Sequence, residues 1–156
     1  MPGIYPSIAS HQLNIIYSLR PIFRKVRCFH PDRQKIIQSE VDKLLADGFM
    51  REVEYPGWLA NVVVVPKNGE KWWVYVDYIN LNDACSKDSF SLPWIDQIVD
   101  STTGHEMLSF IDAFFGYHQI PMFQPDEEKT AFVTPHKLYC CKVMSARALN
   151  EVQKLA

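Results

Sequence analysis

The chain has 156 residues, of which 47% are hydrophobic and 22% are charged. This balance is ordinary for a globular protein and too apolar for a disordered one, and the length suffices for one domain or part of a larger one. The formal net charge of −2 excludes a strongly basic chain, so contacts with nucleic acid would need a local patch. The longest aliphatic run, Val62–Val65, is far too short to cross a membrane, and we expect no membrane partner.

The cysteines indicate neither a disulfide framework nor a zinc site. No Cys-x-x-Cys pair and no Cys/His array at zinc-ligand spacing is present. The start of the chain has no basic region followed by a long apolar one, so no signal peptide is visible. We therefore expect an intracellular protein with reduced thiols. The four cysteines are Cys28, Cys85, Cys140 and Cys141.

Residues 1–29 contain three prolines and lack clear periodicity, which predicts an extended lead-in. A basic cluster begins in this segment and continues beyond it. Two interpretations of this cluster stay open, a solvated surface and a phosphate-binding one. Its members are Arg20, Arg24, Lys25, Arg27, Arg33 and Lys35.

A helix is predicted after the lead-in. Pro31 suits the first turn of a helix, where its missing N–H costs nothing. Gly48 is a good C-terminal cap. Between them the apolar residues fall on one face at helical spacing, namely Ile37, Val41, Leu44 and Leu45.

The strongest local signal is a β-hairpin. The β-branched run Val62–Val65 and the strand-like run Trp72–Val76 are separated by a segment that contains Asn68-Gly69. Asn-Gly tolerates the positive φ angles of a type I′ turn, so the two runs should pair. Alternation along the second strand places Trp72, Val74 and Val76 on one face and Trp73, Tyr75 and Asp77 on the other.

The remaining elements are weaker. A second helix is predicted from Pro93 to Gly104, and an apolar strand over residues 107–111 ends at Asp112. A short strand near residues 118–122, a polar linker over residues 124–129 and a last strand pair over residues 130–133 and 138–143 complete the order. Helix, hairpin, helix and further strands indicate an α+β fold rather than an alternating parallel α/β one.

Asp112 is the candidate for chemistry. A carboxylate at the end of a strand is held rigidly and can ligate a hard cation such as Mg²⁺. Taken alone, an Asp after a strand is more often a turn or helix-cap residue. The surrounding sequence decides between these readings.

The segment Leu108–Ile120, which reads LSFIDAFFGYHQI, closely resembles the first catalytic motif of gypsy-type LTR-retrotransposon reverse transcriptases, plant-like elements above all. Further stretches resemble the same family in order and extend the resemblance over nearly the whole chain. They are Glu40–Glu52, Tyr55–Val65, Val76–Asn82, Lys87–Pro93, Ile95–Thr102 and Glu128–Phe132.

The resemblance implies the fingers and part of the palm of a reverse transcriptase within a retrotransposon polyprotein. The implied activity is RNA-directed DNA polymerisation, a nucleotidyl transfer that extends a DNA primer on an RNA template with deoxynucleotides. Asp112 matches the first Mg²⁺-binding catalytic Asp of the palm. Tyr117 matches the aromatic residue that selects deoxynucleotides. Phe115 and Gly116 match the turn whose backbone approaches the incoming triphosphate. The resemblance also makes Lys67 and Lys71 candidates for phosphate contact.

The chain departs from the family pattern at four places. Trp73 stands where the family has an arginine that binds the triphosphate. Lys137 stands at a turn that usually carries glycine, so we expect an altered turn. The family's Pro-Phe-Gly-Leu-type motif does not follow Met144, and no Asp-Asp pair occurs. We therefore expect that Asp112 holds Mg²⁺ weakly and that this chain alone is inactive.

Residues 145–156 resemble a helix found downstream of the polymerase domain in the same elements. Leu149, Val152 and Leu155 would form its apolar side. The expected division is a lead-in over residues 1–29, fingers and partial palm over residues 30–144, and a downstream helix fragment over residues 145–156, joined after a deletion. We also expect self-association through an exposed palm edge.

Two alternatives belong to other functional classes. The chain could be a non-catalytic nucleic-acid-binding remnant that uses the basic cluster, which a steep salt dependence of binding would support. It could also be an unselected gene fragment without function, which cooperative unfolding would argue against.

Overall fold

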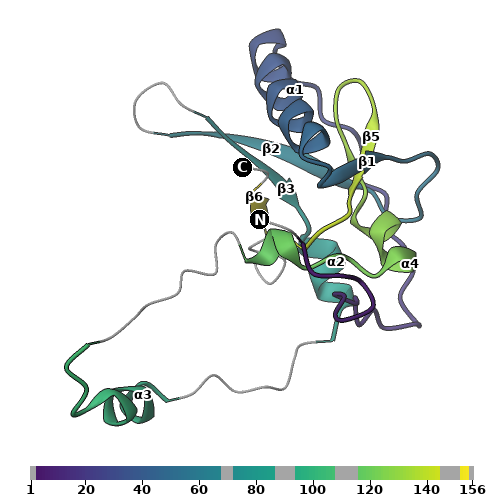
Figure 1. Cartoon of the computed structure of the whole chain (residues 1–156). Coiled ribbons are helices and arrows are strands. Elements are labelled where there is room, and N and C mark those ends of the chain that lie inside the picture. The colour runs from purple at the N-terminus through teal and green to yellow at the C-terminus, as the bar shows by residue number, and fades with distance from the viewer. Residues whose placement is uncertain (1–2, 68–71, 87–93, 108–115, 145–151, 155–156) are drawn as a thin grey trace.

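The computed structural model describes residues 3–67, 72–86, 94–107, 116–144 and 152–154 (Figure 1). Four α-helices, two 3₁₀ helices and six strands occur in these ranges. In chain order they are α1 (Pro31–Ala46), β1 (Met50–Glu52), β2 (Ala60–Pro66), β3 (Trp72–Asp77), α2 (Ile79–Ala84), α3 (Ile95–Thr102), η1 (Tyr117–Gln119), α4 (Gln124–Glu127), η2 (Glu128–Thr130), β4 (Phe132–Val133), β5 (Leu138–Cys141) and β6 (Val152–Lys154).

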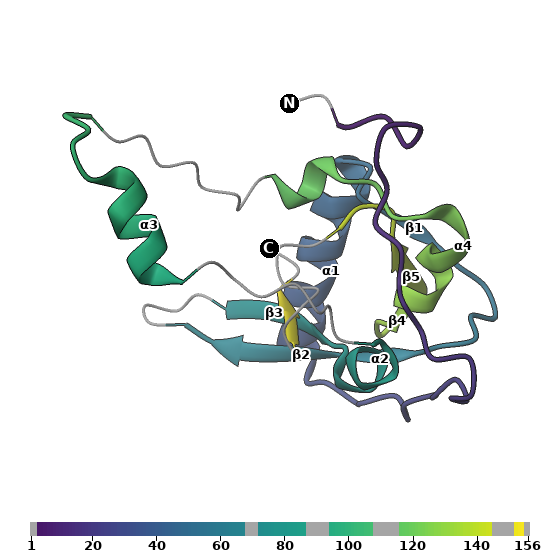
Figure 2. The same ribbon diagram turned by 90° about the horizontal axis from the view of Figure 1, so that it is seen from below.

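The strands form one sheet in the order β1-β5-β4-β2-β3-β6. Neighbouring strands are antiparallel except β2 and β4, which are parallel. Helix α1 lies on one face of the sheet (Figures 1 and 2). Its side chains Ile37 and Val41 share a core with Val62, Val76 and Phe132 from the strands, and all five are fully buried. The α+β fold that the sequence predicts is confirmed.

The predicted hairpin is confirmed as the β2–β3 pair. Val62 lies opposite Val76 and Val65 lies opposite Trp73. Its β-branched and aromatic composition suits paired, half-buried strands. Residues 68–71 lie outside the described ranges, so the predicted type I′ turn stays a prediction.

Helix α1 ends as the sequence predicts. Pro31 occupies its first turn, and the side chain of His30 accepts a hydrogen bond from the backbone N–H of Asp32 at 3.4 Å. At the other end Gly48 has a φ of 74°. The N–H of Phe49 donates to the carbonyl of Leu44, and that of Gly48 donates to Leu45. This pair of hydrogen bonds is a Schellman motif.

We expect Gly48→Ala to lower the free energy of unfolding by about 1 kcal/mol, because a Cβ is unfavourable at positive φ. The new Cβ would meet nothing within 4 Å, so the loss would report backbone strain alone. Urea unfolding followed by circular dichroism measures it. Gly57→Ala is the matched control, since Gly57 also has open space around it but no positive φ. An equal loss in both variants would contradict the strain argument.

Residues 3–29, the N-terminal strap, form neither a helix nor a strand ladder. The strap runs along the side of the molecule away from the hairpin tip (Figure 2). Backbone hydrogen bonds tie it to distant segments. The N–H of Ile4 donates to Gln119 and that of Ile16 to Ala84, both at 2.8 Å, while the N–H of Leu59 donates to Ile22. The strap therefore joins parts of the chain that are far apart in sequence.

The predicted strand at residues 118–122 is wrong. Residues 117–119 form η1, and only isolated bridges follow, between Pro121 and Val143 and between Met122 and His11. Pro121 has no N–H to donate to a ladder, which limits pairing there.

The predicted polar linker at residues 124–129 is also wrong. These residues form α4 and most of η2, with Pro125 in the first turn of α4. Asp126, Glu127 and Thr130 are buried. Their polar side chains are held by partners from other elements, which local composition cannot reveal.

The predicted C-terminal helix is contradicted at residues 152–154, which form β6 and pair antiparallel with β3. A helix of about 12 residues is marginal in isolation. The backbone of β3 instead offers unpaired N–H and C=O groups along its outer edge, and pairing with them overrides the weak helical pattern. The rest of residues 145–156 lies outside the described ranges.

The second predicted helix is present as α3, although Pro93 lies outside the described residues. Its apolar stripe is exposed, at 77% for Ile95, 50% for Ile98 and 56% for Val99. Figure 2 shows α3 away from the sheet. The predicted strand over residues 107–111 falls almost wholly outside the described ranges; only Met107 is described, 90% exposed. The last strand pair is confirmed as β4 and β5. Among the described helices none combines the length and apolar character needed to cross a membrane.

Candidate nucleotide and nucleic-acid site

Three of the predicted site residues, Asp112, Phe115 and Lys71, lie outside the described residues. Their roles stay predictions. Within the described ranges no group of three or more His, Cys, Asp or Glu side chains could hold a metal ion.

Gly116 and Tyr117 lie in a short helical turn. The carbonyl of Gly116 accepts a hydrogen bond from the N–H of Gln119 at 3.1 Å, and that of Tyr117 accepts from Ile120 at 3.0 Å. The N–H of Met144 donates to Ile120 at 2.8 Å, which ties the turn to the chain after β5. Both residues are half-buried. The turn places a glycine with little bulk beside a partly exposed phenol ring.

His118 anchors this turn to the body. Its ring lies 4.9 Å from that of Phe49, centroid to centroid. Burial lowers the pKa of His118, and the negative charge of Asp47 opposes that shift. The contact with Phe49 therefore holds the His118 ring against the body of the protein.

The two faces of the β2–β3 hairpin differ in their contacts. On the face toward α1, Val74 is buried and the guanidinium of Arg33 lies 5.4 Å from the centroid of the Trp72 ring. On the outer face, the ammonium of Lys67 lies 4.0 Å from the centroid of the Trp73 ring. Lys67, predicted to contact phosphate, is thus held over an aromatic ring. Among the described contacts none joins it to the Gly116–Gln119 turn.

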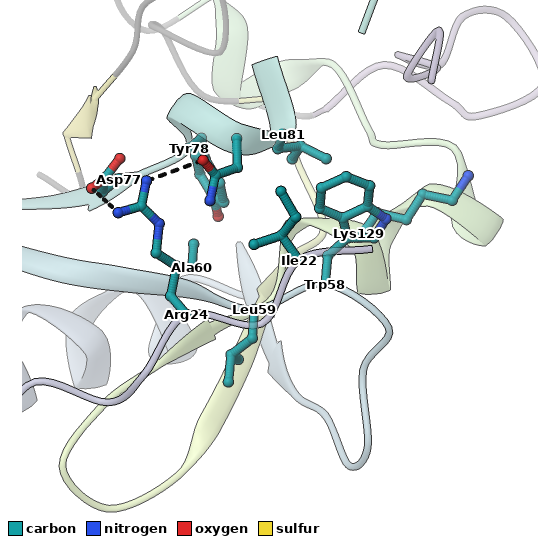
Figure 3. A pocket seen from close by; sticks show the side chains of 10 residues that line it. Ile22, Arg24, Trp58, Leu59, Ala60, Asp77, Tyr78, Leu81 and Lys129 are labelled. Atoms are coloured by element: carbon teal, nitrogen blue, oxygen red, sulfur yellow. Dashed lines mark hydrogen bonds and ion pairs between the residues drawn. The ribbon is translucent and has the colours of Figure 1, made fainter. Parts of the chain in front are cut away.

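Asp77 is the last residue of β3 and lies at the end of the hairpin that is far from its tip. It is 9% exposed, and one carboxylate oxygen accepts a hydrogen bond from the N–H of Ile79 at 3.3 Å. The other oxygen lies 3.9 Å from a guanidinium nitrogen of Arg24 (Figure 3). It also lies 4.0 Å from a guanidinium nitrogen of Arg27. Arg24 also donates to the side-chain carbonyl of Asn80 at 3.1 Å. Asp77 is thus a hydrogen-bonding and ion-pairing residue at the end of β3.

A small open pocket lies beside this ion pair (Figure 3). Ile22 of the strap, Trp58 and Leu81 form its apolar wall, while Arg24 and Asp77 line its polar end. The carboxylate of Asp77 is paired with arginines, and Asn80 and Lys129 also line the pocket.

A polar cluster that the sequence analysis missed holds α4 and η2 in place. One oxygen of Asp126 accepts from the N–H of Leu13 at 2.9 Å, and the other accepts from the ammonium of Lys129 at 2.6 Å. Arg51 of β1 donates to Glu127 at 2.8 Å. The i,i+3 spacing of Asp126 and Lys129 could have indicated their ion pair. The second partner of Asp126, Leu13 in the strap, is 113 residues away in sequence, so no local pattern indicates it.

Tyr78, Thr130 and Cys140 are buried. The hydroxyl of Tyr78 donates to the carbonyl of Thr130 at 2.6 Å. Burial raises the pKa of Tyr78 well above its ordinary value, and burial raises the pKa of the Cys140 thiol to about 12. Both groups are neutral at physiological pH, and a neutral buried thiol is a poor nucleophile. Cys140 is therefore a core residue rather than a candidate nucleophile.

Side-chain hydrogen bonds hold the turn at Lys137, and whether it differs from the family's turn stays a prediction. Lys137 does not have a positive φ. Its N–H donates to the hydroxyl oxygen of Thr134 at 3.1 Å, and that hydroxyl donates to the carbonyl of Lys137 at 2.8 Å. The Lys137 ammonium lies 2.7 Å from a carboxylate oxygen of Glu52 on β1. The Thr134 hydroxyl thus closes a turn that needs no positive φ at Lys137.

Comparisons with known proteins identify the family to which this fold belongs. Residues 65–155 match the family model of the reverse transcriptase (RNA-dependent DNA polymerase). The chain is 31% identical over 124 residues to the retrovirus-related Pol polyprotein from transposon opus of Drosophila melanogaster, an alignment that covers 76% of this chain and 12% of that protein. The chain thus spans about an eighth of the length of this relative.

Solved structures agree with this match. The prototype foamy virus protease-reverse transcriptase superposes with a TM-score of 0.69 at 20% identity, over 86% of this chain and 18% of that one. The foamy viral protease-reverse transcriptase in complex with double-stranded DNA gives a TM-score of 0.63 at 17% identity, over 91% and 24%. The fold is that of a reverse transcriptase domain, in which the sheet and α1 form the described core. The chain belongs to the reverse transcriptase (RNA-dependent DNA polymerase) family, and its relatives are retrotransposon Pol polyproteins.

Proposed function

We propose that this chain is the fingers and part of the palm of a gypsy-type, plant-like retrotransposon reverse transcriptase. The family match over residues 65–155 is the observation that carries the proposal. The ancestral reaction is RNA-directed nucleotidyl transfer to a DNA primer, and the partners are an RNA template, a DNA primer and deoxynucleotides. We place the fingers and palm at residues 30–144, after a lead-in over residues 1–29, in an intracellular protein.

Residues of this chain have distinct roles in that reaction. Asp112 is the candidate Mg²⁺ ligand, and the ion would stabilise charge at the attacking and leaving oxygens. The partly exposed ring of Tyr117 would restrict the space beside the sugar. Gly116 carries no side chain, so the backbone there can approach a triphosphate. Phe115, Lys67 and Lys71 complete the proposed nucleotide site.

The chain alone should be inactive. Mg²⁺ keeps most of its ligands as water unless several carboxylates converge, and no Asp-Asp pair occurs in this sequence. Trp73 lacks the charge and the forked donors of an arginine. Self-association through an exposed palm edge is proposed as well, because unpaired strand edges template association with other chains.

We expect the purified chain not to extend a DNA primer on an RNA template with Mg²⁺ and deoxynucleotides. Each tenfold loss in rate corresponds to about 1.4 kcal/mol of barrier, so losing charge stabilisation at two sites removes detectable turnover. Trp73→Arg alone should not restore activity, since the metal defect remains. A gel-based primer-extension assay measures both.

Asp112→Asn is the control for this assay. If the unmodified chain extends the primer and Asp112→Asn abolishes this extension, the proposal that the chain alone is inactive is contradicted. The missing carboxylates would then have to come from a partner. Extension that survives Asp112→Asn would argue against the proposed role of Asp112 itself.

A second candidate function is non-catalytic binding of nucleic acid. Arg24 and Arg27 of the basic cluster favour it, because both converge on the end of the hairpin and remain partly exposed, at 32% and 47% of their side chains. A fragment without function remains the third reading, and cooperative unfolding of the purified chain would count against it.

A further inference from the structure

Strand β6 covers the outer edge of the β2–β3 hairpin (Figure 1). It pairs antiparallel with residues 75–77, the half of β3 next to α2, and Gln153 lies opposite Val76 at the centre of this ladder. Strand β3 has six residues and β6 has three. A segment near the end of the chain therefore occupies an edge to which another strand could be added.

The sequence of β3 is one that pairs readily with other strands. Residues 72–76 read WWVYV, five aromatic or β-branched residues of high strand propensity. The run contains no charge and no proline, two of the features that keep strands from joining edge to edge. Its first charge comes at Asp77, the last residue of the strand. An open β3 edge would therefore be a template for association.

The sequence of β6 has the opposite character. The strand is short and contains Lys154, and short length and lysine are two means by which natural sheets protect their edges. The neighbouring residues Glu151, Leu155 and Ala156 are good helix formers, so local propensity does not favour a strand here. Strand β6 thus replaces an apolar edge by a short charged one, and backbone pairing with β3 keeps it extended.

We propose that β6 is a detachable cap on β3 and that the edge under this cap binds the β3 edge of a second copy of the chain. Two copies of one edge can pair antiparallel about a two-fold axis, because such an interface is self-complementary. A register centred between Val74 and Tyr75 places Asp77 of each copy opposite Trp72 of the other, so the two carboxylates do not meet. Cross-strand pairs of aromatic and β-branched residues stabilise such a ladder.

This edge belongs to the fingers hairpin and is separate from the palm edge of the proposed function. The proposal requires neither nucleic acid nor Mg²⁺, so it stands whether or not the chain polymerises DNA. The cap and the second copy compete for the same backbone groups. Both copies must release β6 before their β3 strands can pair, so the apparent affinity falls with the square of the open fraction. A cap that is open in about a tenth of the molecules weakens association by about a hundredfold.

Sedimentation velocity over a range of protein concentrations tests the proposal on the full chain. The double variant Gln153→Pro/Lys154→Pro removes two consecutive backbone N–H groups, one of which faces β3, because the N–H groups of consecutive strand residues point to opposite sides. This variant should dimerise at least about tenfold more tightly than the unmodified chain. Gln153→Ala/Lys154→Ala is the matched control, since it changes the same side chains and keeps both N–H groups, and it should associate as the unmodified chain does. Circular dichroism of each variant verifies the fold.

A change in the opposite direction provides a second test. Gln153→Thr raises the strand propensity of β6 and should weaken association, so the proposal can be judged even if the proline variant does not fold. Hydrogen exchange locates the interface. In the proline variant, residues 72–77 should exchange quickly in dilute solution and more slowly as the dimer forms.

Equal association of the proline and alanine variants would overturn the proposal, and so would association that leaves residues 72–77 without protection. Weaker association of the proline variant would overturn it too, because it would show that β6 itself is exchanged between copies. Association through the palm edge should not respond to any of these variants. None of these results bears on the proposed polymerase ancestry, which the Asp112-dependent extension assay judges separately.

Discussion

Phe132→Ala should lower the free energy of unfolding by about 3–5 kcal/mol. Phe132 has no exposed surface and is the largest of the fully buried side chains in the described part of the chain. It sits in β4, between β5 and β2, with its ring 6.2 Å from that of Tyr139. Truncation removes the burial of a ring and leaves a cavity among residues from three strands and α1. Domains are stable by only about 5–15 kcal/mol, so this loss is a large fraction of the total stability.

Urea unfolding followed by circular dichroism measures this loss. Phe123→Ala is the matched control, because it makes the same change at a ring that is 37% exposed. The control should cost much less, since a partly hydrated side chain contributes less on burial. Equal losses for Phe132→Ala and Phe123→Ala would show that the centre of the core is not at β4.

The hairpin and α1 could be predicted because their signals are local. Asn68-Gly69 lies between two β-branched or aromatic runs, and the two runs pair as predicted. Pro31 and Gly48 mark the two ends of α1, and both act there through backbone geometry. Such signals depend on a few adjacent residues, so no knowledge of the tertiary structure is needed to read them.

The errors occur where distant contacts decide the outcome. Residues 124–129 are polar in composition, but Asp126 is buried because Leu13 and Lys129 satisfy its two oxygens. Residues 152–154 have a helical pattern, but the edge of β3 supplies backbone partners for a strand. In both places a tertiary interaction outweighs local propensity, which is a weak prior.

The candidate site was predicted mainly by resemblance, since Asp112 alone would be read as a turn residue. Gly116 and Tyr117 lie in one tight turn, and their roles at a nucleotide site stay predictions. The contact between Lys67 and Trp73 was not foreseen. Alternation alone places Trp73 and Tyr75 on one face, but the position of a flexible lysine side chain at a strand end cannot be derived from spacing.

Asp126→Ala should cost about 2–3 kcal/mol and should also loosen the N-terminal strap. The carboxylate is 5% exposed and is the acceptor for the N–H of Leu13 in the strap and for Lys129 in η2. Hydrogen bonds to charged groups contribute about 1.5–3 kcal/mol each, and an amide left unsatisfied in a half-buried position adds to the loss. Lys129 is 38% exposed, so water compensates part of its side of the interaction.

Two readouts separate loosening of the strap from general destabilisation. Urea unfolding gives the free-energy loss, while hydrogen exchange at Leu13 reports opening of the strap under native conditions, because local opening can precede global unfolding. Asp126→Asn keeps an oxygen for the N–H of Leu13 but loses the charge, so it should cost less and leave Leu13 better protected. Asp96→Ala on α3, where the aspartate is exposed, should change neither quantity. If Asp126→Ala lowers stability while exchange at Leu13 stays as slow as in the unmodified chain, Asp126 serves α4 and η2 alone and does not hold the strap.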